Sequence, residues 1–131
     1  MNLELHHIGV ATKNIEKEFA IFQKLGYKKI SDTFSDEIQK IKGLFIEADN
    51  QPRLELLENL GENGPLDSCL KNGTKFYHLA YKTNNIQKDS DELIKEVKAK
   101  LIVPITEANY FDKICFLMLP NMTLIELVQE R

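Results

Sequence analysis

The sequence repeats itself at a constant offset of 71 (78 − 7 for two histidines, 126 − 55 for two glutamates), and this repeat limits the possible folds. Residues 7–15 are similar to residues 78–86, because histidine, threonine, asparagine and isoleucine recur at matching positions. Residues 54–57 are similar to residues 125–128, with the glutamate in the same register. Since both ends of the unit match, the chain is predicted to contain two copies of one supersecondary module.

Each copy has the hydrophobic pattern of one strand, one helix and three further strands. In the first copy, Asn14 is suited to cap a helix and Gly26 to end it, so we expect that helix over residues 15–25. The expected strands of the first copy cover residues 3–11, 27–33, 41–47 and 53–58. In the second copy we expect a helix over residues 86–100 and strands over residues 76–82, 101–105, 114–119 and 123–128.

This order of elements predicts an α+β fold in which two βαβββ modules follow one another in tandem. Module 1 is expected at about residues 1–58 and module 2 at about residues 76–131, within a single domain of 131 residues. The connector, residues 59–75, carries three of the six glycines and is expected to form a short helix near residues 65–70. Neither module alone buries both faces of its sheet, so the two are expected to fold together.

The composition is that of an ordinary globular protein, and it excludes several classes of partner. The net charge of −3 lacks the clustered basic excess that a nucleic-acid surface needs. No apolar run reaches the roughly 20 residues that cross a bilayer, and the first residues lack the pattern of a signal peptide. Cys69 and Cys115 lie far apart without ligand-like spacing, which is typical of reduced thiols in a cytoplasmic protein.

A histidine on the first strand and a glutamate on the last strand are the chemically active residues that recur in each copy. Alternation along the strand places Glu126 on the same face as Leu124 and Val128, so its carboxylate is expected to be buried. A buried carboxylate needs a partner, and a divalent cation can supply one. Two imidazoles and two carboxylates suit Zn, Ni, Co, Mn or Fe(II) better than Ca or Mg. The predicted metal ligands are His7, Glu55, His78 and Glu126.

A simpler interpretation exists for each of these residues taken alone. A histidine on a strand is commonly structural or exposed, and Glu55 could simply pair with Arg53. The recurrence of both residue types at the same spacing of 48 (55 − 7 and 126 − 78) favours the metal site. His6 has no counterpart in the repeat and is expected to be structural, whereas Glu47 and Glu58 are expected to be solvated.

The same segments are similar to the vicinal oxygen chelate superfamily, the group of glyoxalases, bleomycin resistance proteins and dioxygenases. The similarity is carried by residues 5–11, 54–61, 77–81 and 124–127, which hold all four of the family's ligand positions. It implies that the two modules form a curled mixed sheet around a metal-binding cleft, and that homodimers are frequent. It also implies that the four predicted ligands bind one divalent ion, with Co, Ni, Zn and Mn as the candidates.

Within the superfamily the chain is most similar to methylmalonyl-CoA epimerase and bacterial glyoxalase I, and residues 55–66 favour the epimerase. This resemblance implies a metal-dependent isomerase or epimerase that transfers a proton next to the carbonyl of an acyl-CoA thioester. Glu55 and Glu126 are then the candidates for the catalytic acid and base. The loops at residues 107–113 and 120–122 depart from the family pattern, so the substrate is not fixed.

Two alternatives remain for the function. Glyoxalase I (lactoylglutathione lyase), which isomerises a glutathione hemithioacetal, uses the same enolate chemistry. Glutathione carboxylates are commonly held by arginine, and the chain has only Arg53 and Arg131. The second alternative is a non-catalytic small-molecule binding or resistance protein, a class whose members generally lack the metal ligands.

Overall fold

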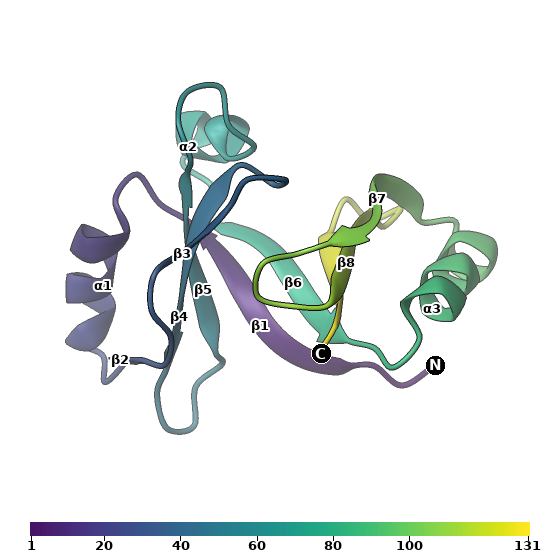
Figure 1. Cartoon of the computed structure of the whole chain (residues 1–131), viewed down its shortest axis with the longest axis horizontal. Coiled ribbons are helices and arrows are strands. Elements are labelled where there is room, and N and C mark those ends of the chain that lie inside the picture. Colours follow the sequence, from purple (N-terminus) through teal and green to yellow (C-terminus); the bar gives the residue numbers. More distant parts are fainter. The chain divides into compact units, whose positions relative to one another are not determined.

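The fold is α+β, as the sequence predicts, with a large mixed β-sheet and few helices (Figure 1). The computed structural model describes residues 1–131 and divides into two compact units. One unit spans His7–Tyr77, and the other combines Met1–His6 with His78–Arg131. Strand β1 (Glu4–Ala11) contributes residues to both units. No helix is both long enough and apolar enough to cross a membrane.

In the unit His7–Tyr77, the first and last strands of the predicted module pair in parallel. The strand order is β2-β4-β5-β1, and β3 pairs with β4. The strands are β2 (Lys28–Lys29), β3 (Phe34–Asp36), β4 (Ile41–Glu47) and β5 (Leu54–Asn59). Strand β5 lies parallel to β1, with Gly9 opposite Glu55. Residues that are far apart in the sequence therefore become neighbours across this pair of strands.

Helix α1 (Ile15–Gln23) starts where the sequence predicts, because two side chains satisfy its first N–H groups. Asn14 Oδ1 accepts a hydrogen bond from Lys17 N, and Glu58 Oε1 accepts one from Ile15 N, both at 2.9 Å. The helix ends two residues earlier than predicted. The sequence predicts a solvated Glu58, and its role at the start of this helix corrects that prediction.

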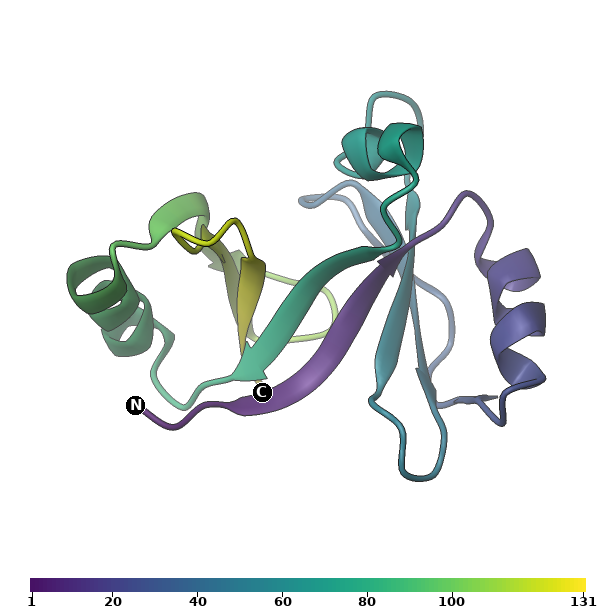
Figure 2. The same ribbon diagram turned by 180° about the vertical axis from the view of Figure 1, so that it is seen from behind.

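Helix α1 lies beside the β4–β5 hairpin, and the connector helix α2 (Asp67–Asn72) lies at the end of the hairpin away from its turn (Figure 2). The core beneath α1 consists of Val10, Ile15, Phe19, Tyr27, Leu44, Ile46, Leu54 and Leu56. Phe45 and Glu55 alternate with these residues along β4 and β5, so their side chains point to the opposite face of the sheet. That face is the one left for a functional site.

The strand predicted over residues 27–33 is the poorest prediction in this unit. Only Lys28–Lys29 pair with β4, and the chain pairs with β4 again at Phe34–Asp36. Ser31 accounts for the interruption, because its Oγ accepts a hydrogen bond from Phe45 N at 3.0 Å. In a continuous strand a backbone carbonyl would accept that bond.

The second unit repeats the same plan, with strand order β6-β9-β8-β7. Its strands are β6 (Phe76–Lys82), β7 (Lys100–Glu107), β8 (Lys113–Met118) and β9 (Leu124–Gln129), and β6 lies parallel to β9. Helix α3 (Ile86–Glu92) is capped as α1 is. Asn85 Oδ1 accepts from Lys88 N at 3.0 Å, and Gln129 Oε1 accepts from Ile86 N at 2.9 Å. The contacts that cap α3 therefore involve residues 71 positions after those that cap α1, the same offset as in the sequence repeat.

The helix predicted over residues 86–100 is shorter than expected. After α3 the chain makes a π-helical segment, Leu93–Val97, and the helical stretch stops there. Lys98 follows in the left-handed conformation at φ 64°, which ends the helix and turns the chain into β7.

Cys115 is predicted to be inert to thiol reagents in the folded protein. Burial raises the pKa of its thiol to about 12; a backbone hydrogen bond with Leu127 lowers the pKa and the charge of Glu126 raises it. The thiolate is the reactive form, so it should be essentially absent at pH 8. In a Cys69→Ser variant, we expect a disulfide reagent to label no thiol natively and one thiol in denaturant. Rapid native labelling of that variant would contradict the burial of Cys115.

Candidate metal centre

His7 and Glu55 form a buried pair within the unit His7–Tyr77. The distance from His7 Nε2 to Glu55 Oε1 is 3.0 Å. His7 is 0% exposed and Glu55 is 6% exposed. The parallel pairing of β1 with β5 brings the two residues together, although 48 positions separate them in the sequence (55 − 7). The carboxylate is therefore held against an imidazole on a face with little access to water.

His78 and Glu126 form an equivalent pair within the other unit. The distance from His78 Nε2 to Glu126 Oε1 is 3.1 Å, and both residues are buried. Strand β6 pairs with β9 in the same register that β1 and β5 use, with Ala80 opposite Glu126. The two units therefore build the same His–Glu pair from the same two strands.

These pairs have the chemistry of metal ligands. The four side chains that could hold a metal ion, here called the His/Glu group, are all buried: His7, Glu55, His78 and Glu126. Two ligand atoms held about 2.1 Å from one ion at roughly 90° lie about 3.0 Å apart. The separations of 3.0 and 3.1 Å within the pairs fit this arrangement. A divalent cation would also balance the charge of carboxylates that are removed from water.

Each histidine of these pairs also contacts a phenylalanine that sequence reasoning missed. The ring centroids of His7 and Phe45 are 5.0 Å apart at 77°, and those of His78 and Phe116 are 5.1 Å apart at 90°. Each phenylalanine lies opposite the glutamate of its own pair on the neighbouring strand. The signal that could have found them is the offset of the repeat, which also relates the two phenylalanines (116 − 45 = 71). Both phenylalanines lie in apolar stretches of sequence that are typical of core strands, so the sequence alone did not indicate their contact with the histidines.

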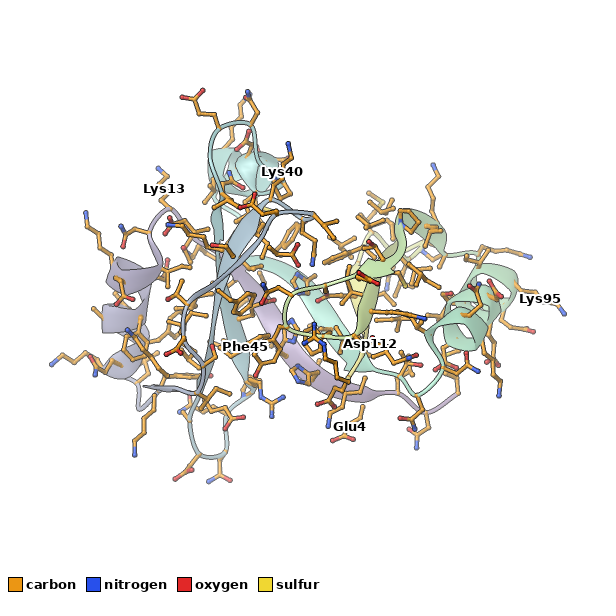
Figure 3. The ribbon with its side chains drawn as sticks, viewed as in Figure 1. Glu4, Lys13, Lys40, Phe45, Lys95 and Asp112 are labelled. Carbon is orange, nitrogen blue, oxygen red and sulfur yellow. The ribbon has the colours of Figure 1, made fainter.

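Phe45 is itself fixed by tight packing on the face of the sheet opposite α1, where Figure 3 labels it. Its ring stacks on that of Phe34, with centroids 5.7 Å apart and an interplanar angle of 20°. Phe34 in turn lies directly over Gly43, where an added Cβ would overlap the Phe34 ring. Because Gly43 has no side chain, Phe34 has room to stack on Phe45, and the Phe45 ring in turn contacts His7.

The sequence of this chain matches a known family. The family described as the glyoxalase/bleomycin resistance protein/dioxygenase superfamily matches residues 6–116, which is most of the chain. The chain belongs to this superfamily. None of the curated proteins matches it. The two repeated His–Glu pairs are therefore found in a superfamily that includes metal-dependent epimerases and glyoxalases.

Several solved structures share this fold at low sequence identity. A hypothetical protein from Bacillus halodurans C-125 is 22% identical, with a TM-score of 0.84 over 100% of this chain and 96% of that chain. Methylmalonyl-CoA epimerase from Mycobacterium tuberculosis is 18% identical, with a TM-score of 0.83 over 97% and 87%. A Streptomyces coelicolor methylmalonyl-CoA epimerase variant, in complex with 2-nitronate-propionyl-CoA, is 20% identical, with a TM-score of 0.81 over 98% and 99%.

Both arginines of this superfamily member are held by other protein groups. Arg131 donates hydrogen bonds to the backbone carbonyls of Ala108, Asn109 and Tyr110, at 2.9–3.4 Å, and so holds the loop that departs from the family pattern. Arg53 Nε donates to Glu47 Oε1 at 2.7 Å. The Glu47 side chain is 45% exposed, so it is solvated as predicted and is also paired with Arg53.

His6 is buried beside the same loop. Its ring meets that of Phe111 edge-on, with centroids 5.0 Å apart at 80°. Phe111 also packs against Tyr110. The sequence predicts a structural His6, and this ring contact gives the residue a packing role between β1 and the loop.

Removing either phenylalanine ring should weaken metal binding. In Phe45→Leu and Phe116→Leu variants, the imidazole loses the ring edge that fixes its plane, and we expect the metal Kd to rise about 10- to 100-fold. Competition with a chromophoric chelator measures the change. Phe22→Leu is the matched control, because Phe22 packs edge-on against Tyr27 at the opposite face of the sheet. An unchanged Kd in both site variants would show that the rings only fill space.

Proposed function

We propose that this protein is a metal-dependent epimerase that transfers a proton next to the carbonyl of an acyl-CoA thioester, as methylmalonyl-CoA epimerase does. The observation that carries the proposal is the repeated buried His–Glu pair, with 3.0 Å in one unit and 3.1 Å in the other. The fold shared with methylmalonyl-CoA epimerases supports the choice of reaction. The substrate class comes from those neighbours.

We assign one divalent ion, Co, Ni, Zn or Mn, to the four residues of the His/Glu group. When bound, such an ion supplies Lewis-acid stabilisation of the negative charge that develops on a carbonyl oxygen during α-proton removal. The imidazole nitrogens and carboxylate oxygens suit these metals better than Ca or Mg. Burial of the donors lowers the local dielectric and strengthens their interaction with a cation.

Glu55 and Glu126 are the proposed proton-transfer residues. One carboxylate removes the α-proton, and a group on the opposite face of the substrate returns a proton to complete the inversion. Each carboxylate has one oxygen within 3.1 Å of an imidazole nitrogen, which holds it in a defined orientation. Because one glutamate comes from each unit, single variants can separate their roles.

Glyoxalase I is the alternative enzyme, and the arginines argue against it. A glutathione hemithioacetal carries carboxylates that arginine would bind bidentately. Arg131 already donates to three backbone carbonyls, and Arg53 donates to Glu47. The non-catalytic alternative, a small-molecule binding or resistance protein, would make no use of two buried His–Glu pairs.

The deciding experiment combines metal analysis with isotope exchange. Purified protein should contain, or take up on dialysis, one divalent ion per chain. Incubation with methylmalonyl-CoA in heavy water, with Co, Ni, Mn or Zn, should place deuterium at the α-carbon. No exchange with any of these metals would refute the epimerase. Turnover of a glutathione hemithioacetal would support glyoxalase I, and ligand binding without either reaction would support a binding protein.

A cytoplasmic homodimer is part of the same proposal. The family resemblance favours a dimer, and the two unpaired cysteines fit a reducing compartment. Light scattering after size-exclusion chromatography tests the dimer directly. A mass of 15.1 kDa at micromolar concentration would mean a monomer.

A further inference from the structure

The unit His7–Tyr77 contains a cavity of about 340 Å³ in which none of the proposed metal ligands takes part. It lies between the first turns of α1 and the connector that holds α2. Its volume falls within the range of small-molecule sites, roughly 300–1,000 Å³. It therefore has the size to accept a small ligand.

The mouth of this cavity carries excess positive charge. Lys13, Lys17 and Lys75 line it together with one acid, Glu18, which pairs with Lys75. The ammonium groups of Lys13 and Lys17 are exposed, and neither has a hydrogen-bond or ion-pair partner. Figure 3 labels Lys13 on the loop that precedes α1. The lining thus has a net charge of +2 (three lysines and one glutamate) on a chain whose net charge is −3.

The wall of the cavity is apolar. Ile21 is 62% exposed, and it lines the cavity with Leu70 and Cys69. Three of the N–H groups at the start of α1 are already bonded to Asn14 and Glu58. An anion would therefore be held by lysine ammonium groups, with its apolar part against Ile21 and Leu70.

The repeat provides an internal comparison, because the other unit has an equivalent cavity at the start of α3. In the register of the repeat, Asn84 occupies the position equivalent to Lys13, and Glu92 occupies the position equivalent to Ile21. Among the side chains that line it, the acids Asp89 and Glu92 balance Lys82 and Lys88, and Lys82 also approaches Glu130 at 3.6 Å. The fold thus produces the cavity twice, but only one copy combines unpaired lysines with an apolar wall.

We propose that the cavity beside α1 binds an amphipathic anion, a phosphate or carboxylate group carried on a short apolar segment. Lys13 and Lys17 contact the anionic group, and Ile21 and Leu70 contact the apolar segment. This site is separate from the metal centre and does not depend on the proposed epimerase activity.

Calorimetric titration of the full chain with octyl phosphate tests the proposal, in the presence of a chelator so that the metal centre takes no part. We expect saturable binding of one molecule per chain, and at least tenfold weaker binding in a Lys13→Gln, Lys17→Gln double variant. Lys88→Gln, at the position equivalent to Lys17, is the matched control and should bind as the wild type does. No saturable binding, or equal weakening by Lys88→Gln, would overturn the site.

Three further measurements define the ligand and its position. Octanoate in place of octyl phosphate separates a carboxylate ligand from a phosphate ligand. Inorganic phosphate should bind at least tenfold more weakly, and equal affinity would refute the apolar part of the proposal. Bound octyl phosphate should slow the alkylation of Cys69, which lines the cavity. Unchanged alkylation at saturating ligand would place the ligand elsewhere.

Discussion

Replacement of Glu126 by glutamine should remove most of the bound metal and slow α-proton exchange by a factor on the order of 10² to 10⁴. The substitution preserves the size of a side chain that is only 4% exposed, so packing should survive. It removes the negative charge that a divalent ion requires and the carboxylate that accepts a proton. Metal content by mass spectrometry and deuterium incorporation into methylmalonyl-CoA measure the two losses.

Glu58→Gln is the matched control for this variant. Glu58 caps α1 through Oε1, and the other unit already uses Gln129 for the equivalent hydrogen bond. Glutamine should therefore support the same cap, leaving metal content and exchange rate near those of the wild type. If Glu126→Gln keeps its metal and its exchange rate, Glu126 is neither a ligand nor a proton-transfer group.

The companion variant Glu55→Gln separates the roles of the two carboxylates. Because Glu55 and Glu126 each lie at about the same distance from an imidazole, we expect both glutamine variants to bind metal more weakly. The proton-transfer roles need not be equal, since a substrate that lacks twofold symmetry presents its α-proton to one side. A variant that can be reloaded at high metal concentration but still fails to exchange identifies the residue that removes the proton.

Loading the protein with metal should raise its Tm by more than about 10 °C, and His78→Asn should abolish most of that increase. A ligand at about 1,000 times its Kd stabilises the folded state by about 4 kcal/mol. For a chain of this size each kcal/mol shifts Tm by about 4 °C. The measured quantity is the difference between the Tm of metal-loaded protein and the Tm of protein treated with a chelator.

His6→Asn controls for the loss of a buried imidazole. His6 is adjacent in sequence to His7 and also buried, but its ring contacts Phe111. This variant should lower the Tm of the metal-free protein and keep the full increase on metal loading. An equal loss of the metal-dependent increase in both variants would mean that His78 has no special part in metal binding.

The sequence was sufficient to predict the repeat, the α+β class and several elements. Strands Ile41–Glu47 and Phe76–Lys82 have the predicted bounds, because each is a largely apolar segment between polar and turn-forming residues. Helix α1 starts at the predicted residue because Asn14 is a local signal. The four predicted ligand positions come from the repeat, which compares each residue with its own equivalent.

The errors share a cause, which is that the deciding partner is distant in sequence. Ser31 interrupts a strand by bonding to Phe45, which strand alternation alone does not reveal. Glu58 has the pattern of a solvated strand residue, but the start of α1 lies 43 positions away and supplies its partner. Phe45 and Phe116 were not predicted, because an aromatic ring in the core and one packed against a predicted metal ligand have the same sequence pattern.

The parallel pairing of the first and last strand in each unit has a consequence for how the protein folds. A histidine and its glutamate become neighbours only after the helix and intervening strands have been placed, since the chain must close a loop that spans the whole module. Such closure is entropically costly and late, so topology of this kind slows folding. Metal uptake during refolding should therefore lag behind secondary-structure formation and report the completion of each module.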